Sequence, residues 1–238
     1  MKDQELKILH ISHADRQGGA AIAASRIHKA LLSTGKDSHM WVNRKTSGTR
    51  NTECFNGHIK AHLQDTKRLV SGGIVSRIFK SENKIVHSPQ VFNSTWPERI
   101  NSSSADIVNL HWVCNEMLSV RDISKIRKPI IWSFHDMWPL CGAEHYTEDH
   151  RWREGYSAHN RPSWESGFDL NKFTWKRKKR HWKKAGGVVA PSVWLSNITK
   201  NSILFKNWDV TTIQYPIDVN FWKPIDKENC RAQLDLPK

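Results

Sequence analysis

Short apolar runs alternate with amphipathic stretches along most of the chain. Residues 7–11 form an apolar run that predicts a strand, and apolar side chains recur at helical spacing between Ala20 and Leu31. The polar turn between these two segments ends in the pair Gly18-Gly19. A strand, a glycine turn and a helix in this order predict the opening of a βαβ unit.

The same alternation continues toward the C-terminus. Each later strand is predicted by a short apolar or β-branched run, and polar or helical segments separate these runs. The expected strands are residues 38–42, 105–111, 129–134, 186–191 and 210–213, and helices are expected over residues 193–202 and 226–234. Strands separated by helices predict an α/β fold, in which helices flank a parallel, Rossmann-like sheet.

Two stretches do not follow this alternation. Residues 46–101 are polar and support only weak helices, so we expect a mobile polar insertion there. Residues 141–171 contain many His, Trp, Arg and Glu side chains without a regular period. For this second stretch we expect a long ordered loop.

The net charge constrains the kind of partner. The 238 residues include 37 Lys and Arg against 23 Asp and Glu, which gives a net charge of +14. Such an excess favours an anionic partner, which can be a nucleic acid, an anionic membrane surface or a phosphorylated substrate. The twelve tryptophans fit core packing, stacking on bases or sugars, or a membrane interface.

Neither secretion nor membrane insertion is expected. No apolar run reaches the length of a membrane span, and the first residues lack the apolar segment of a signal peptide. The four cysteines are far apart and form no CxxC pair, which favours reduced thiols. These features predict a cytoplasmic protein.

Polar and aromatic side chains follow two of the predicted strands. His111 and Trp112 end one strand, and His135 and Asp136 follow the next. The carboxyl ends of parallel strands form the ligand crevice of such sheets. We therefore expect both pairs to face one cleft.

The glycine pair Gly18-Gly19 has two interpretations. It precedes a predicted helix, where free backbone N–H groups and the helix dipole suit an anion. A tight turn that needs a positive φ explains the same residues. The pattern is not GxGxxG, so it gives little support to dinucleotide binding.

The loop that follows Asp136 contains four candidate metal ligands. They are Glu144, His145, His150 and His159. Their spacing matches no zinc signature, so we expect a polar loop that lines a substrate groove, without a metal ion. No GxSxG or comparable nucleophile motif is present.

Residues 172–184 predict a basic amphipathic helix. Eight of these thirteen residues are Lys or Arg, and Trp175 and Trp182 are seven residues apart on one face. This pattern has three interpretations. The aromatic face can pack in the core, dock on an anionic membrane or stack with single-stranded nucleic acid. Nucleic acid is the least favoured partner, because no RRM, KH or OB pattern is present. The candidate membrane or anion contacts are Lys176, Lys179, Arg180 and Lys183.

Three of these segments together resemble a known enzyme family. Residues 10–21, residues 135–139 with the sequence His-Asp-Met-Trp-Pro, and residues 190–195 are similar to the N-terminal domain of family 4 retaining glycosyltransferases. The resemblance is to the bacterial enzymes that assemble surface polysaccharide and lipopolysaccharide. Residues 215–224 resemble the segment that joins the two domains of these enzymes.

The resemblance implies the N-terminal half of a two-domain GT-B architecture. In that family the N-terminal half mostly holds the acceptor and the C-terminal half binds the nucleotide sugar. We therefore expect residues 1–222 to form the acceptor-side domain and residues 223–238 to begin the interdomain segment. The donor-binding domain with its paired glutamates is absent from this sequence. We expect negligible transfer by the isolated chain and a gain of activity from a separate donor-half polypeptide.

The resemblance also assigns roles to individual residues. Gly18 and Gly19 approach the donor diphosphate, and His135 with Asp136 lies near the transferred sugar, so that His135→Ala abolishes transfer in a completed enzyme. In such enzymes the departing diphosphate helps to deprotonate the acceptor, so the protein mainly orients the reactants, with a nucleotide sugar as co-substrate and no metal or other cofactor. The expected acceptor-cleft residues are His111, Trp112, Trp138, Glu144 and His145.

The chain departs from the family at two places. Relatives often carry several cysteines in the loop after the histidine-aspartate pair, whereas Glu144, His150 and His159 occupy that region here. Relatives also often have Asn before the proline at residue 216, where this chain has Tyr215. The acceptor is expected to be a glycan or a lipid-linked glycan, with the protein peripheral on the inner face of the cell membrane. The alternative function is a non-catalytic basic module that binds an anionic membrane or single-stranded nucleic acid.

Overall fold

The computed structural model describes residues 6–54 and 58–237. Its strands are β1 (Ile8–Ala14), β2 (Ser38–Arg44), β3 (Thr52–Cys54), β4 (Phe79–Ser81), β5 (Ile107–Leu110), β6 (Ile130–Ser133), β7 (Glu165–Gly167), β8 (Gly187–Ala190) and β9 (Asp209–Thr212). Its helices are α1 (Gly19–Ser33), α2 (His58–Ile78), α3 (Trp96–Ser102), α4 (Val120–Lys125), α5 (Arg151–Glu154), α6 (Leu170–His181), α7 (Val193–Lys200) and α8 (Lys227–Gln233).

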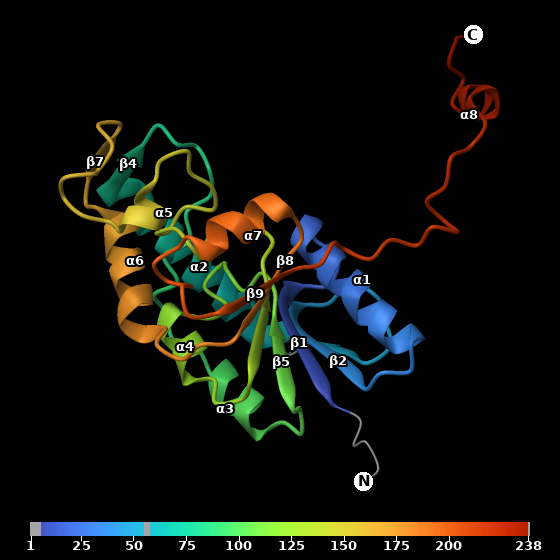
Figure 1. Cartoon of the computed structure of the whole chain (residues 1–238), viewed down its shortest axis with the longest axis horizontal. Coiled ribbons are helices and arrows are strands. Elements are labelled where there is room, and N and C mark those ends of the chain that lie inside the picture. The colour runs from blue at the N-terminus through green and yellow to red at the C-terminus, as the bar shows by residue number, and fades with distance from the viewer. Residues whose placement is uncertain (1–5, 55–57, 238) are drawn as a thin grey trace.

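Seven of the strands form one parallel sheet (Figure 1). The spatial order is β3-β2-β1-β5-β6-β8-β9, so the chain builds outward from β1 on one side and then returns to build outward on the other. The predicted α/β, Rossmann-like fold is confirmed, and the sequence pattern predicts every strand of this sheet except β3. The reversal between β1 and β5 is the place where such sheets leave a crevice at their carboxyl ends.

The main core lies on one face of the sheet. Alternate residues of β1, β5, β6 and β8 join apolar side chains of α4, α6 and α7 in a single buried cluster. Trp132 of β6 is central to it, with its ring 5.1 Å from Trp182 and 6.1 Å from Phe205. On the opposite face, Ala24 of α1 packs on Met40 and Val42 of β2.

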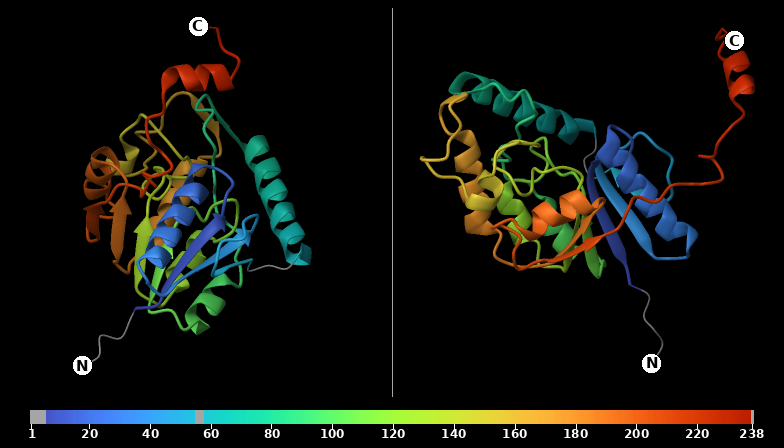
Figure 2. Two further views of the ribbon diagram at one scale, coloured as in Figure 1. Left: turned by 90° about the vertical axis from the view of Figure 1, so that its right-hand side faces the viewer. Right: turned by 45° about the horizontal axis from the view of Figure 1, so that its top comes forward.

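Residues 46–101 contain more regular structure than the weak helices that the sequence predicts. This stretch contains the 21-residue helix α2, which lies along the outside of the molecule in Figure 2, and the strand β4. The pattern of α2 is hard to recognise because several of its apolar side chains, Leu69 and Ile74 among them, remain exposed instead of forming one buried stripe.

Parts of the two stretches that break the alternation form one structural unit, which we call the outer unit. It consists of residues 79–94 together with residues 141–171, joined by the antiparallel pairing of β4 with β7. A second link is the backbone hydrogen bond from Ser88 N to Ala143 O, at 2.7 Å. Gly167 is required in β7, because its φ is +74° and a Cβ there would collide with the carbonyl oxygen of Ile78.

Candidate functional site

A cleft of about 780 Å³ opens at the carboxyl ends of β1, β5 and β6, where the strand order reverses. One wall is the turn from β1 into α1, with Gly18, Gly19 and the side chain of Arg26. The opposite wall carries side chains that follow β5, β6 and β9. They are Trp112, His135, Asp136 and Tyr215. The structure thus brings together the glycine pair, Trp112 and the pair His135-Asp136 at one cleft, and His111 lies behind His135.

The glycine wall presents backbone to the cleft. Gly18 is the N-cap of α1 with φ +87°, a conformation that favours glycine, and it brings no side chain to cover the first amides of the helix. A Cβ added at Gly19 would meet no atom within 4 Å, so this residue borders open space. The first turn of α1 contains no acidic residue. Free amides at a helix N-terminus beside Arg26 suit an anion.

The opposite wall is supported by a chain of hydrogen-bonded rings, which we call the histidine chain. His10 Nδ1 lies 2.9 Å from His111 Nε2, and His111 Nδ1 lies 3.1 Å from His135 Nε2. His135 Nδ1 lies 2.6 Å from the hydroxyl of Tyr215. Neighbouring ring centroids are 5.2 and 5.3 Å apart, close to the spacing of the strands that carry them. Adjacent parallel strands therefore set the chain's geometry.

The rings of the histidine chain are neutral near pH 7. Burial lowers the pKa of His10 from its ordinary value of 6.5 to about 3, and nearby His28 adds to the effect. Burial lowers the pKa of His111 well below the ordinary value, and that of His135 to about 4 although Asp136 opposes the shift. A neutral imidazole donates from one nitrogen and accepts at the other, so the tautomers of the three rings depend on one another.

Asp136 is held by three donors. Its Oδ2 accepts from Trp112 Nε1 at 3.0 Å and from His145 Nδ1 at 2.6 Å, and its Oδ1 accepts from the backbone N–H of Trp138 at 3.0 Å. His145 is oriented by Ser88 Oγ, 2.9 Å from its Nε2. The carboxylate is therefore fixed at the cleft wall before any ligand binds.

Two of the predicted acceptor-cleft residues lie in the interior. Trp138 is buried and donates from Nε1 to the carbonyl of Ser88 at 2.8 Å. Glu144 is also buried, and its carboxylate accepts a short hydrogen bond from the hydroxyl of Tyr156. His111 and His145 are mostly covered and reach the cleft through His135 and Asp136. Of the five predicted acceptor contacts, Trp112 lines the cleft.

The polar side chains of residues 141–171 stabilise the outer unit from within. Arg151 is buried and donates to both Glu165, at 2.6 Å, and Asp149, at 2.8 Å. Among the residues that the structure describes, no group of three or more His, Cys, Asp or Glu side chains is placed to hold a metal ion.

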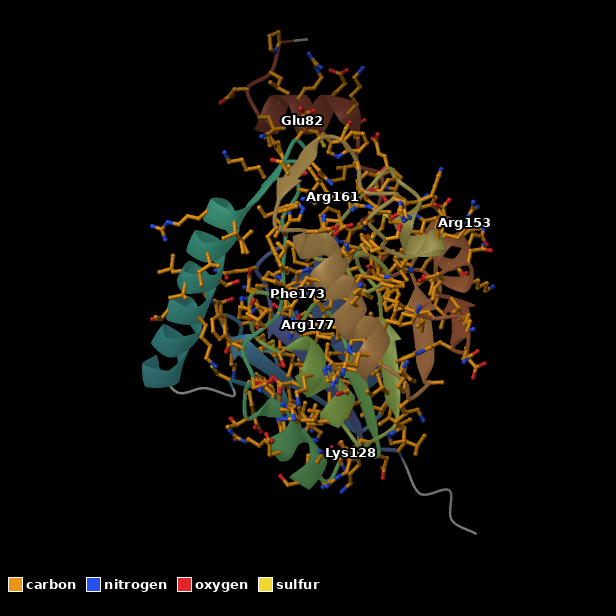
Figure 3. The ribbon with its side chains drawn as sticks, turned by 90° about the vertical axis from the view of Figure 1, so that its left-hand side faces the viewer. Glu82, Lys128, Arg153, Arg161, Phe173 and Arg177 are labelled. Carbon is orange, nitrogen blue, oxygen red and sulfur yellow. The ribbon has the colours of Figure 1, made fainter. Side chains whose placement is uncertain are left out.

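The predicted basic helix corresponds to α6 and the residues that follow it. Lys176, Lys179, Arg180 and Lys183 are exposed. Trp175 and Trp182 are buried in the core, so neither aromatic face is open to a base or a lipid. Figure 3 shows α6 from outside, with Phe173 and Arg177 labelled along it.

Lys178 of the same helix points inward. Its ammonium group donates to the carbonyl oxygens of Trp138, Cys141 at 3.0 Å and Gly142 at 2.7 Å. It also lies 3.8 Å from the centre of the Trp138 ring. Burial lowers the pKa of this amine, and the thiols and carboxylates around it act in the opposite direction.

Sequence reasoning missed His10, Arg26 and the function of Tyr215 in the site. His10 lies in an apolar run that indicates only a strand, and Arg26 is one cation among many. The one signal for Tyr215 is its replacement of the asparagine that is common in the similar family. The hydroxyl that this replacement supplies is the end of the histidine chain.

None of the helices in the described part of the chain is long and apolar enough to cross a membrane. The sequence matches no protein-family model and no curated protein. The classification that the structure supports is a Rossmann-like α/β fold with a seven-stranded parallel sheet.

Proposed function

We propose that this chain is the N-terminal, acceptor-side part of a retaining glycosyltransferase. The enzyme would transfer a sugar from a nucleotide sugar to a glycan or lipid-linked acceptor during synthesis of a cell-surface polysaccharide. One observation carries the proposal: the cleft at the strand reversal has a glycine-flanked helix N-terminus on one wall and the fixed pair His135 and Asp136 on the other.

The glycine wall suits the diphosphate of the donor. Gly18 and Gly19 expose backbone amides, the helix dipole favours negative charge, and Arg26 adds a cation that can form two parallel hydrogen bonds with a phosphate. The overall net charge of +14 attracts the same ligand over a longer distance.

The opposite wall suits a sugar. The Asp136 carboxylate is fixed by three donors yet still borders the cleft, so it is placed to accept hydrogen bonds from sugar hydroxyls. Both ring nitrogens of His135 are occupied by the histidine chain, which holds this side chain in one orientation. These residues would contribute by positioning the reacting groups and by stabilising charge.

Calorimetric titration with pyrophosphate tests the anion wall, because on this proposal the nucleotide is held by the other half of the enzyme. Binding of pyrophosphate is expected, and Gly19→Leu should abolish it because the new side chain enters the cleft. Gly48→Leu is the matched control, since a side chain there also meets open space. Absence of binding by the wild-type chain, or equal binding by Gly19→Leu, contradicts the proposal.

We also propose that the enzyme contacts an anionic membrane through α6. The observation in favour is that Lys176, Lys179, Arg180 and Lys183 all remain exposed in the folded protein. Each near-surface cation contributes about 1 kcal/mol of attraction to an anionic leaflet. Flotation with phosphatidylglycerol vesicles should recover the protein, and phosphatidylcholine vesicles or a variant with these four residues changed to Gln should not. If a single-stranded oligonucleotide instead displaces the protein from the vesicles, the result would favour the nucleic-acid alternative.

A further inference from the structure

A second cavity, of about 570 Å³, lies on the surface of the outer unit. Residues 82–85 form one side of it, and residues 146–149 with Trp164 form the other. The two sides come from the two stretches that interrupt the sheet alternation, and the β4–β7 pairing holds them together. Figure 1 shows β4, β7 and α5 side by side at this end of the molecule.

Exposed aromatic rings distinguish this cavity. Trp164 is 46% exposed and Tyr146 is 43% exposed, and both line it. Trp194, 53% exposed at the start of α7, extends the row, because its ring stacks at 6.4 Å and 30° on that of Tyr146. Only three of the twelve tryptophans are this exposed, and two of the three belong to this row. We call the cavity and this row the aromatic groove.

Polar groups lie beside the rings. Glu82 and Glu148 bring exposed carboxylates to the groove, and Lys84 brings an ammonium group. Asn83 donates to the carbonyl of Tyr146 at 3.0 Å, which ties the two sides together. A sugar ring has an apolar C–H face and a rim of hydroxyls, so it needs a flat aromatic surface with hydrogen-bonding groups at its edge.

The floor of the groove is rigid. Glu165, the residue after Trp164, is held by Arg151 at 2.6 Å and by Asn171 Nδ2 at 2.9 Å. The carbonyl of Trp164 also accepts a hydrogen bond from the backbone N–H of Glu82 at 3.4 Å. A preorganised aromatic surface loses little entropy when a ligand binds.

The groove is connected to the cleft by neighbouring residues. Tyr146 directly follows His145, whose ring hydrogen-bonds Asp136 of the cleft wall. Trp194 lies at the N-terminus of α7, just beyond the carboxyl end of β8 and on the same edge of the sheet as the cleft. The groove and the cleft wall are thus linked through the adjacent residues His145 and Tyr146.

We infer that the aromatic groove binds an oligosaccharide by stacking its sugars on Trp164, Tyr146 and Trp194. On the proposed function, this ligand is the growing acceptor glycan, and the groove holds the part of it that lies away from the reacting end. The acceptor role rests on the proposed function, whereas the binding of an oligosaccharide does not.

An array of bacterial surface oligosaccharides, probed with the purified chain, tests the inference. The strongest oligosaccharide is then titrated by calorimetry. Trp164→Ala and Tyr146→Ala should each weaken binding about tenfold or more, the usual loss when a central aromatic contact is truncated. Phe173→Ala is the matched control, because Phe173 is also an exposed aromatic residue but lies on α6, well separated from Glu82 in Figure 3.

The outcomes separate this inference from the proposed function. The inference is overturned if the protein binds no oligosaccharide on the array. It is also overturned if Trp164→Ala and the wild type bind the oligosaccharide with equal affinity. Gly19→Leu should keep its oligosaccharide affinity while losing diphosphate affinity. Oligosaccharide binding without diphosphate binding would support the inference about the groove and contradict the proposed function. Diphosphate binding without oligosaccharide binding would contradict the inference about the groove alone.

Discussion

The histidine chain predicts a fold that is lost in mild acid. His10, His111 and His135 each have a folded-state pKa below the ordinary value of 6.5, because burial disfavours their charged forms. Between the folded and unfolded pKa values the unfolded chain binds more protons than the folded protein. The contribution of these histidines to the free energy of unfolding is therefore fully present above about pH 6.5, and it is lost as the pH decreases toward about 4.

The magnitude follows from the number of groups. Each histidine that is protonated only after unfolding removes about 1.4 kcal/mol of stability per pH unit, so three of them remove about 4 kcal/mol per unit. Domains are usually stable by about 5 to 15 kcal/mol, so one to two pH units below 6.5 remove much of that amount. Most carboxylates are still ionised in this range, which leaves the histidines as the dominant cause.

The assay is urea unfolding, followed by tryptophan fluorescence, at a series of pH values from about 7.5 to 5.5. The slope of the unfolding free energy against pH gives the number of protons taken up on unfolding. His10→Leu should reduce this slope by about one proton near pH 5.5. His159→Ala is the matched control, because this histidine is exposed in the folded protein, and its slope should equal that of the wild type.

Two results would refute this reasoning. A wild-type slope of less than one proton over this range would show that the buried rings take up protons without unfolding the protein. An unchanged slope in His10→Leu, with a normal slope in His159→Ala, would show that other groups cause the acid sensitivity.

Three further changes test the interior contacts, each by chemical denaturation at neutral pH. Lys178→Met should lower the free energy of unfolding by about 3 kcal/mol, because three carbonyl oxygens lose their donor, whereas the exposed neighbour Lys179→Met should change it little. Arg151→Ala should cost about 3 kcal/mol, because it leaves the buried carboxylate of Glu165 with only the more distant Arg161 at 3.7 Å, and a loss below about 1 kcal/mol would contradict the pairing. Tyr215→Phe should cost about 1 to 2 kcal/mol by removing the hydroxyl at the end of the histidine chain, and no change would mean that water replaces it.

Local patterns determined the sheet and the position of the cleft. Apolar runs mark the strands because a parallel strand that is covered on both faces is rich in apolar residues, and this needs no knowledge of the rest of the chain. The strand-end pairs at residues 111–112 and 135–136 could be placed at one edge for the same reason, since all parallel strands end on the same side. The glycine pair at the first turn was identifiable from its place between a strand and a helix.

Tertiary structure decided how the remaining polar residues are used. The histidine chain joins His10 to His111 across 101 residues and His135 to Tyr215 across 80, and no periodicity within one segment specifies such contacts. Lys178 is one of eight cations in a basic stretch. It is buried while Lys179 is exposed because the carbonyl oxygens of residues 138, 141 and 142 accept hydrogen bonds from its ammonium group.

The outer unit shows the same division most clearly. Residues 79–94 and 141–171 show no regular period by themselves, because some of the groups that hydrogen-bond the backbone of each segment lie in the other. The strands, the glycine turn and the edge at which they meet follow from local sequence, because they depend on near neighbours along the chain. Only the folded chain decided the histidine chain and the aromatic groove, because their members are brought together by the stacking and pairing of distant strands.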